Sequence, residues 1–135
     1  MTDQPHLLLV DFNEDFSAFH GQTMQEQAEY LNEVIAFLLE KYPNAKQIPI
    51  LGHSMGGVVA RLLMSKGKYI ANSVDTIITL SSPHAYPPVP LDAGVEDVYR
   101  LINTGWDEHA NKTLLISLSG GVLDNQLSSE PASLV

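Results

Sequence analysis

Apolar and polar residues follow one another in blocks along this chain of 135 residues. Four short apolar runs have the length of strands, and continuous apolar runs are typical of strands that are buried on both faces of a parallel sheet. The predicted strands are Leu7–Val10, Ile48–Leu51, Val74–Leu80 and Thr113–Ser119.

The long segment between the first two predicted strands has the periodicity of a helix. Apolar residues recur there at the spacing of one helix face, namely Met24, Ala28, Leu31, Ile35, Leu38 and Tyr42. Thr23 followed by Glu26 fits a capping box, and Pro43 cannot continue a helix. The pattern therefore predicts a long amphipathic helix over Thr23–Tyr42.

Two further helices are predicted between the remaining strands. One covers residues 57–64 and ends before Gly67, with Arg61 reaching an edge of the fold. The other covers Val95–His109 and is broken near Gly105. Strands that alternate with helices in this way predict an α/β fold, with a mostly parallel sheet and helices on both faces.

Composition narrows the function classes. The length suits a single domain over residues 1–135, and no apolar run approaches the roughly 20 residues of a membrane span.

The net charge of −9 argues against nucleic-acid binding and against electrostatic docking to anionic lipid. The absence of cysteine excludes disulfides and thiolate chemistry, and no metal or cofactor is predicted. The N-terminus shows no signal-peptide pattern, and Asn111-Lys112-Thr113 is a glycosylation sequon.

The pentapeptide Gly-His-Ser-Met-Gly at residues 52–56 directly follows the second predicted strand. It matches Gly-x-Ser-x-Gly, the nucleophile elbow of α/β-hydrolases, in which the serine sits on a strained turn between a strand and a helix. Gly52 and Gly56 are expected where a side chain would collide with the neighbouring strand or helix. Ser54 is the predicted nucleophile, and the Met55 backbone N–H is the predicted oxyanion donor. The alternative is a Gly-rich turn whose serine caps the helix.

A serine nucleophile needs a base and an acid that orients the base. In this fold the acid follows a later strand, and Asp124 lies just beyond the fourth predicted strand. The alternative for Asp124 is a loop aspartate in an Asx-turn. Asp107 is the second candidate, but it precedes the fourth strand and would emerge at the wrong end of the sheet.

No histidine follows Asp124, although the base is expected after the acid. All five histidines come earlier in the chain: His6, His20, His53, His84 and His109. His84 follows the third predicted strand at the correct edge of the sheet, so it could line the site, but its place in the chain order is wrong for the base. His20 follows the first predicted strand at the same edge and could contact substrate. The alternatives are a solvated loop residue for His20 and a loop histidine satisfied by backbone carbonyls for His84.

The second oxyanion donor normally comes from a loop after a strand upstream of the elbow strand. No glycine-rich loop of that kind precedes the first predicted strand. We therefore expect a partial hydrolase domain, incomplete at both ends, whose first strands and base-bearing terminal strand and helix lie outside these residues.

Four segments together resemble the GPI inositol-deacylase family, the α/β-hydrolases of the endoplasmic reticulum that remove the acyl chain from the inositol of GPI anchors. The segments are residues 10–21, the elbow with Val58–Arg61, residues 80–84 and residues 117–121, and the first is the most specific. The resemblance implies a three-layer α/β-hydrolase-like core with Ser54 as nucleophile and Asp124 as acid. It also implies that the substrate is a carboxylic ester, either in GPI-anchored proteins or in another lipid. The reaction would be linked to the transport of GPI-anchored proteins from the endoplasmic reticulum.

The resemblance further implies a lumenal active site at the endoplasmic reticulum membrane, with membrane association through regions absent from this chain. A generic lipase or carboxylesterase and a non-catalytic truncated fragment remain alternatives. The proline-rich segment Pro83–Pro90 could form an acyl-chain entrance or a plain surface loop. Without a base and a second oxyanion donor, these residues alone are expected to show little or no esterase activity.

Overall fold

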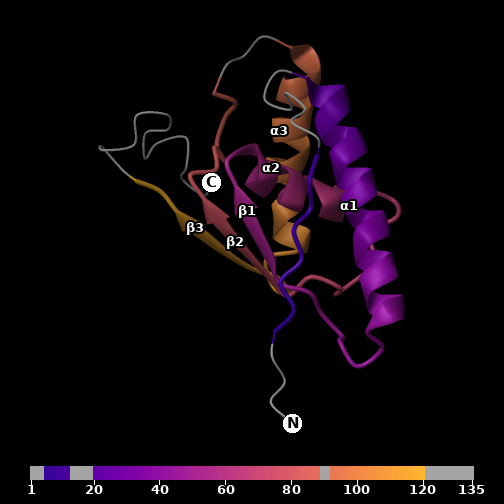
Figure 1. The fold of residues 1–135 in the computed structure, drawn as a ribbon. Coiled ribbons are helices and arrows are strands. Elements are labelled where there is room, and N and C mark those ends of the chain that lie inside the picture. Colours follow the sequence, from indigo (N-terminus) through magenta and orange to yellow (C-terminus); the bar gives the residue numbers. More distant parts are fainter. Residues whose placement is uncertain (1–4, 13–19, 89–91, 121–135) are drawn as a thin grey trace.

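A computed structural model describes residues 5–12, 20–88 and 92–120, and it shows a parallel three-stranded sheet in the order β1-β2-β3 with three helices (Figure 1). The strands are β1 (Ile50–His53), β2 (Thr76–Leu80) and β3 (Leu114–Leu118). The helices are α1 (Gly21–Lys41), α2 (Met55–Leu62) and α3 (Ala93–Gly105). Short 3-10 helices, Leu63–Ser65 and Trp106–Glu108, follow α2 and α3. The predicted α/β class and parallel sheet are confirmed.

All three described helices lie on one side of the sheet. Helix α2 packs directly against β1 and β2, and α1 and α3 pack on α2 and on each other (Figure 1). The other side carries exposed apolar side chains: Leu51, Leu80, Leu114, Ile116 and Leu118. The expected helices on the second face are therefore not found among the described residues. The apolar runs predicted strands correctly, but they carry no information on which element covers each face.

The predicted strand Leu7–Val10 is wrong for the described structure. The segment is extended but has no ladder partner among the described strands, and it runs between the sheet and α1 (Figure 1). Leu7 and Leu9 are 92% and 93% exposed, whereas Val10 and Phe12 pack against the core. An apolar run shows that a segment can be buried in a sheet, but strand formation also needs a hydrogen-bonding neighbour.

Helix α1 begins two residues before the predicted capping box at Thr23. Its N-cap, His20, makes no side-chain cap bond. The Gly21 N–H instead donates to Asp92 Oδ2 at 2.9 Å, and the other carboxylate oxygen accepts from Gly94 N–H at 3.1 Å. One carboxylate thus caps the first turns of both α1 and α3. The local capping signal failed because the cap comes from 71 residues further along the chain.

The other predicted elements are confirmed with shifted ends. Strand β1 begins two residues later than predicted and runs into the elbow motif, and α3 ends at Gly105, where the break was expected. Within residues 5–12, 20–88 and 92–120, no helix is both long enough and apolar enough to cross a membrane.

Candidate active site

Ser54 occupies the turn between β1 and α2 with φ 53° and ψ −128°. This left-handed conformation is unusual for a residue with a side chain, and it costs on the order of 1–3 kcal/mol unless its surroundings enforce it. The Ser54 N–H is held by the Leu80 carbonyl of the adjacent strand at 2.9 Å. Such a strained serine between a strand and a helix is the geometry of a nucleophile elbow.

The glycines that enforce this turn are Gly52 and Gly57. A Cβ on Gly52 would lie 2.7 Å from the Cα of Gly57, so the strand and the helix approach each other too closely for a side chain. A Cβ on Gly57 would lie 2.8 Å from Thr79 Cγ2 and would also strike Ser82. A Cβ on Gly56 would meet nothing within 4 Å. The expected collision is therefore correct for Gly52 but wrong for Gly56, because the residue that faces the sheet is Gly57.

The first turn of α2 presents the predicted oxyanion donor. Met55 is the first residue of α2, where backbone N–H groups have no acceptor within the helix and the helix dipole favours negative charge. The Ser54 side chain makes no cap hydrogen bond to α2. The structure therefore does not support the alternative in which this serine simply caps the helix.

Two strained serines stand side by side at the carboxyl edge of the sheet. His53, Leu80 and Leu118 are partners in the ladder, so the residues that follow them (Ser54, Ser81 and Ser119) form a row across β1, β2 and β3. Ser81 has φ 47°, close to the φ of Ser54, and its N–H donates to the Leu118 carbonyl at 2.8 Å. The sequence motif identified Ser54 but carried no signal for the strain at Ser81.

His84 is not available to substrate, contrary to the expectation that it could line the site. Its side chain is fully buried, with Nε2 2.8 Å from Thr79 Oγ1 and Nδ1 3.5 Å from an Arg61 nitrogen. Burial, and then the neighbouring Arg61 charge, lower the pKa of His84 to about 4. The alternative of a satisfied loop histidine is therefore the better description, although side chains supply its partners. Arg61 is also buried, and the expectation that it reaches an edge is wrong.

His20 is the N-cap residue of α1, and it is exposed. The neighbouring carboxylate is Asp92, whose pKa is lowered first by the backbone N–H of Gly21, then by that of Gly94, and also by His20. Sequence analysis missed Asp92, although an aspartate directly before a helix is a common N-cap signal. His20 stays a prediction as a substrate contact.

The predicted acid, Asp124, lies outside the described residues and stays a prediction. Asp107 lies in the 3-10 helix before β3, at the end of the sheet opposite Ser54, as sequence reasoning expected. In the part of the chain that the structure describes, no three His, Asp or Glu side chains are placed to hold a metal ion.

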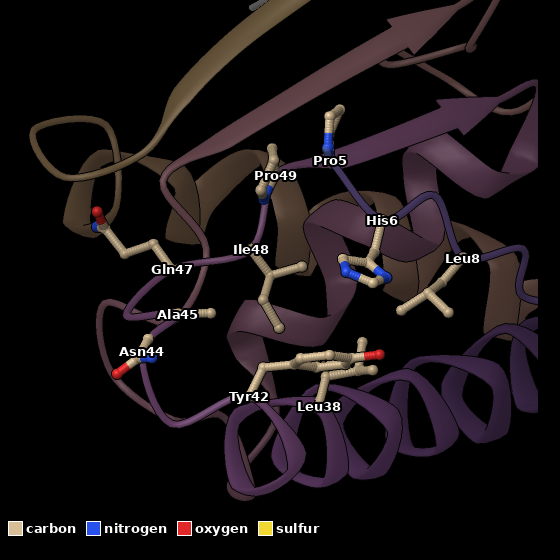
Figure 2. Close-up of a pocket in the computed structure, with 10 residues that line it drawn as sticks. All are labelled: Pro5, His6, Leu8, Leu38, Tyr42, Asn44, Ala45, Gln47, Ile48 and Pro49. Atoms are coloured by element: carbon tan, nitrogen blue, oxygen red, sulfur yellow. The ribbon is translucent and has the colours of Figure 1, made fainter. Parts of the chain in front are cut away.

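A cleft of about 940 Å³ has no residue of the elbow motif in its lining (Figure 2). Its walls are the segment around His6 and Leu8, the end of α1 at Tyr42, and the stretch that enters β1 at Ile48. The His6 and Tyr42 ring centroids are 5.3 Å apart. Because Ile48 precedes β1 and Ser54 follows it, this cleft lies near the amino edge and does not belong to the candidate site.

The start of the proline-rich segment is part of the protein interior. Ser82, Pro83 and His84 are all buried, and exposure begins further along, with Tyr86 at 43%. Neither earlier interpretation, an acyl-chain entrance or a plain surface loop, describes these first residues.

Comparisons with known proteins agree with the α/β fold. A family model described as a PGAP1-like alpha/beta domain matches residues 2–135. A protein from Phaeosphaeria nodorum named GPI inositol-deacylase is 44% identical over 147 residues, covering 93% of this chain and 14% of that protein. Proteins of the same name from Aspergillus fumigatus and Neurospora crassa are 42% and 44% identical and also cover 93% of this chain.

The chain spans only a small part of these relatives, 13% of the Aspergillus fumigatus protein and 12% of the Neurospora crassa protein. The matched region nevertheless includes nearly the whole chain, from the segment before α1 to residues beyond β3. The chain therefore belongs to the PGAP1-like alpha/beta domain family.

Proposed function

We propose that this chain is the nucleophile-bearing part of a serine esterase that removes the acyl chain from the inositol of GPI-anchored proteins. The observation that carries the proposal is Ser54 in a strained turn at the start of α2, with the backbone of Gly52 and Gly57 in close contact. The relatives' name, GPI inositol-deacylase, supplies the substrate. The generic lipase or carboxylesterase is less favoured because no relative cited above carries such a name.

In the proposed mechanism, the Ser54 hydroxyl attacks the ester carbonyl that joins the acyl chain to inositol. A histidine outside this chain takes the serine proton, oriented by Asp124, and then returns it to the departing inositol oxygen. The Met55 N–H and a second donor from outside this chain stabilise the oxyanion, and each such donor is worth roughly 10²–10³ in rate. Water then attacks the acyl-serine and releases the fatty acid.

The substrate implies a site at a membrane that carries GPI-anchored proteins, and we propose the lumenal face of the endoplasmic reticulum. Asn111 of the sequon is exposed in the turn before β3, so it is accessible to glycosylation in that compartment. Membrane association would come from parts of the protein outside these residues.

The purified chain of 135 residues tests where the base comes from. We expect a fluorophosphonate probe to label it little or not at all, because no hydrogen bond joins a described histidine to Ser54 and the proposed base lies elsewhere. Ser54→Ala is compared with Ser119→Ala, which alters an exposed serine at the same edge. Strong labelling that disappears only in Ser54→Ala would contradict an external base.

A chimera tests the activity itself. This chain replaces the matching segment of the Neurospora crassa relative in cells that lack their own enzyme, and mass spectrometry follows the inositol acyl chain on a GPI-anchored protein. We expect deacylation by the chimera and by its Ser119→Ala variant, and complete loss in Ser54→Ala. Deacylation that survives Ser54→Ala would exclude Ser54 as the nucleophile.

A further inference from the structure

Three consecutive backbone carbonyls after β2 each accept a hydrogen bond from a different side chain. The bonds join Tyr99 Oη to the Pro83 carbonyl (2.7 Å), an Arg61 nitrogen to the His84 carbonyl (3.5 Å), and Asn103 Nδ2 to the Ala85 carbonyl (3.1 Å). Burial raises the pKa of the Tyr99 hydroxyl, so it stays protonated and donates. The donors come from α2 and α3, so two helices fix a loop that contains no regular structure.

The His84 ring extends this set of bonds into the sheet. A guanidinium can only donate, so the Arg61 nitrogen at 3.5 Å makes His84 Nδ1 an acceptor and places the ring proton on Nε2. Nε2–H then donates to Thr79 Oγ1 at 2.8 Å. The Thr79 hydroxyl donates in turn to the Ile116 carbonyl of β3 at 3.4 Å. His84 and Thr79 each accept one hydrogen bond and donate one, so the chain of bonds runs from Arg61 to the Ile116 carbonyl.

Arg61 is buried, and its charge is compensated by backbone and aromatic groups. It donates to the Ile102 carbonyl at 3.1 Å, in the last turn of α3, where the helix dipole favours a cation. Its guanidinium also lies 5.1 Å from the centre of the Trp106 ring. Burial lowers the pKa of Arg61 to about 10, so it is still charged at neutral pH. The charge therefore holds the loop without a carboxylate partner in the described residues.

The loop fixed in this way is the neighbour of the nucleophile. Ser81, next to Ser54 in the row of serines, has a strained φ of 47°. The Ser82 side chain is fully buried against Gly57, and its hydroxyl has no hydrogen-bond partner within the described structure. Neither feature stabilises the loop, so its conformation depends on bonds made further along.

We infer that Arg61, His84 and Thr79 are positioning residues that hold residues 81–85 as a rigid wall beside Ser54. This inference rests on the proposed role of Ser54 as nucleophile. The physical reason is preorganisation: a wall that is already fixed costs nothing to order when the transition state forms.

Two variants of similar size separate a positioning role from simple packing. His84→Gln keeps one donor and one acceptor, whereas His84→Leu fills the space and leaves Arg61 and Thr79 without their bonds. Amide hydrogen exchange is measured at Ser54 and Ser81, whose N–H groups bond across the carboxyl edge. The reference amides are Ile48 and Leu114, which bond across the amino edge of the same sheet.

We expect His84→Leu to speed amide exchange at Ser54 and Ser81 by about tenfold relative to the two reference amides. In His84→Gln we expect the exchange rates of all four amides to stay close to those of the parent chain. An equal increase at all four amides, or equal behaviour of the two variants, would show a general packing role and overturn the inference. Exchange does not require a reactive Ser54, so failure of the esterase proposal would be seen separately.

A measurement on the unaltered chain keeps the inference testable if His84→Leu does not fold. The ring nitrogens of His84 are observed by nitrogen-15 NMR at neutral pH. We expect a neutral ring with its proton on Nε2, as the Arg61 and Thr79 contacts require. A proton on Nδ1, or a charged ring, is incompatible with the proposed chain of hydrogen bonds and would overturn it.

Discussion

Gly57→Ala is expected to destabilise the chain by about 1–3 kcal/mol, whereas Gly56→Ala in the same turn of α2 should stabilise it by roughly 0.5–1 kcal/mol. The added methyl group at Gly57 would lie 2.8 Å from Thr79 Cγ2 and against the fully buried Ser82. Neither neighbour is a flexible chain end, so the helix must move away from the sheet. At Gly56 the methyl group meets open space and only reduces the freedom of the unfolded chain.

Thermal unfolding distinguishes the two variants directly. With about 4 °C of Tm per kcal/mol for a chain of this size, Gly57→Ala should lower Tm by roughly 4–12 °C and Gly56→Ala should raise it by about 2–4 °C. The two substitutions add the same methyl group to adjacent residues, so helix propensity cannot explain a difference of sign. Equal shifts would mean that α2 does not approach β2 as closely as the structure shows.

The elbow was predictable because its signals are local. A strand, a glycine-flanked serine and a helix occur within about fifteen consecutive residues, and each can be recognised from the residues directly around it. The motif also predicted that α2 needs a glycine where it approaches a neighbouring element closely. It indicated Gly56 for this contact, whereas the structure shows Gly57. The error arises because the consensus describes spacing from the serine, whereas the collision depends on which residue of the first helical turn faces β2.

The buried polar network was not predictable from the sequence. Arg61 and His84 are 23 positions apart, and Gly21 and Asp92 are 71 apart. Nothing in the periodicity of α2 marks Arg61 as an interior residue, because an isolated charge in an apolar helix normally suggests an exposed position. Its acceptors are backbone carbonyls and a ring nitrogen, which no pattern of acidic residues could have indicated.

The failure at residues 7–10 has a different physical cause. The apolar run is compatible with a sheet, and its alternate residues do differ in burial, from 93% exposure at Leu9 to the packed side chain of Val10. Strand formation, however, depends on a neighbour whose free N–H and C=O groups match. That neighbour is a property of the folded assembly and leaves no trace in the segment itself.

The stability of the chain should fall as the pH is lowered through the range in which His84 would titrate. In the folded state burial holds the pKa of His84 at about 4, below its ordinary value of 6.5. Between these values the unfolded chain binds a proton at this position and the folded chain does not, so acid favours unfolding. The contribution of His84 should decrease by about 2 kcal/mol as the pH falls from about 7 to about 4.5.

His84→Gln isolates this contribution, because the amide can keep a donor and an acceptor but cannot titrate. The groups that face His84 are Arg61 from α2, Thr79 from β2 and, through the Pro83 carbonyl, Tyr99 from α3. Neither Arg61 nor Tyr99 changes charge in this range, so they do not mask the effect.

Urea unfolding of the parent chain and of His84→Gln at each pH gives the difference in their free energies of unfolding. The contributions of the other histidines and of the carboxylates cancel in this difference. A variant whose stability falls with acid as steeply as that of the parent chain would show that folding leaves the pKa of His84 near its ordinary value of 6.5. The ring would then be charged in acid while still folded, and the buried Arg61–His84 bond would be untenable.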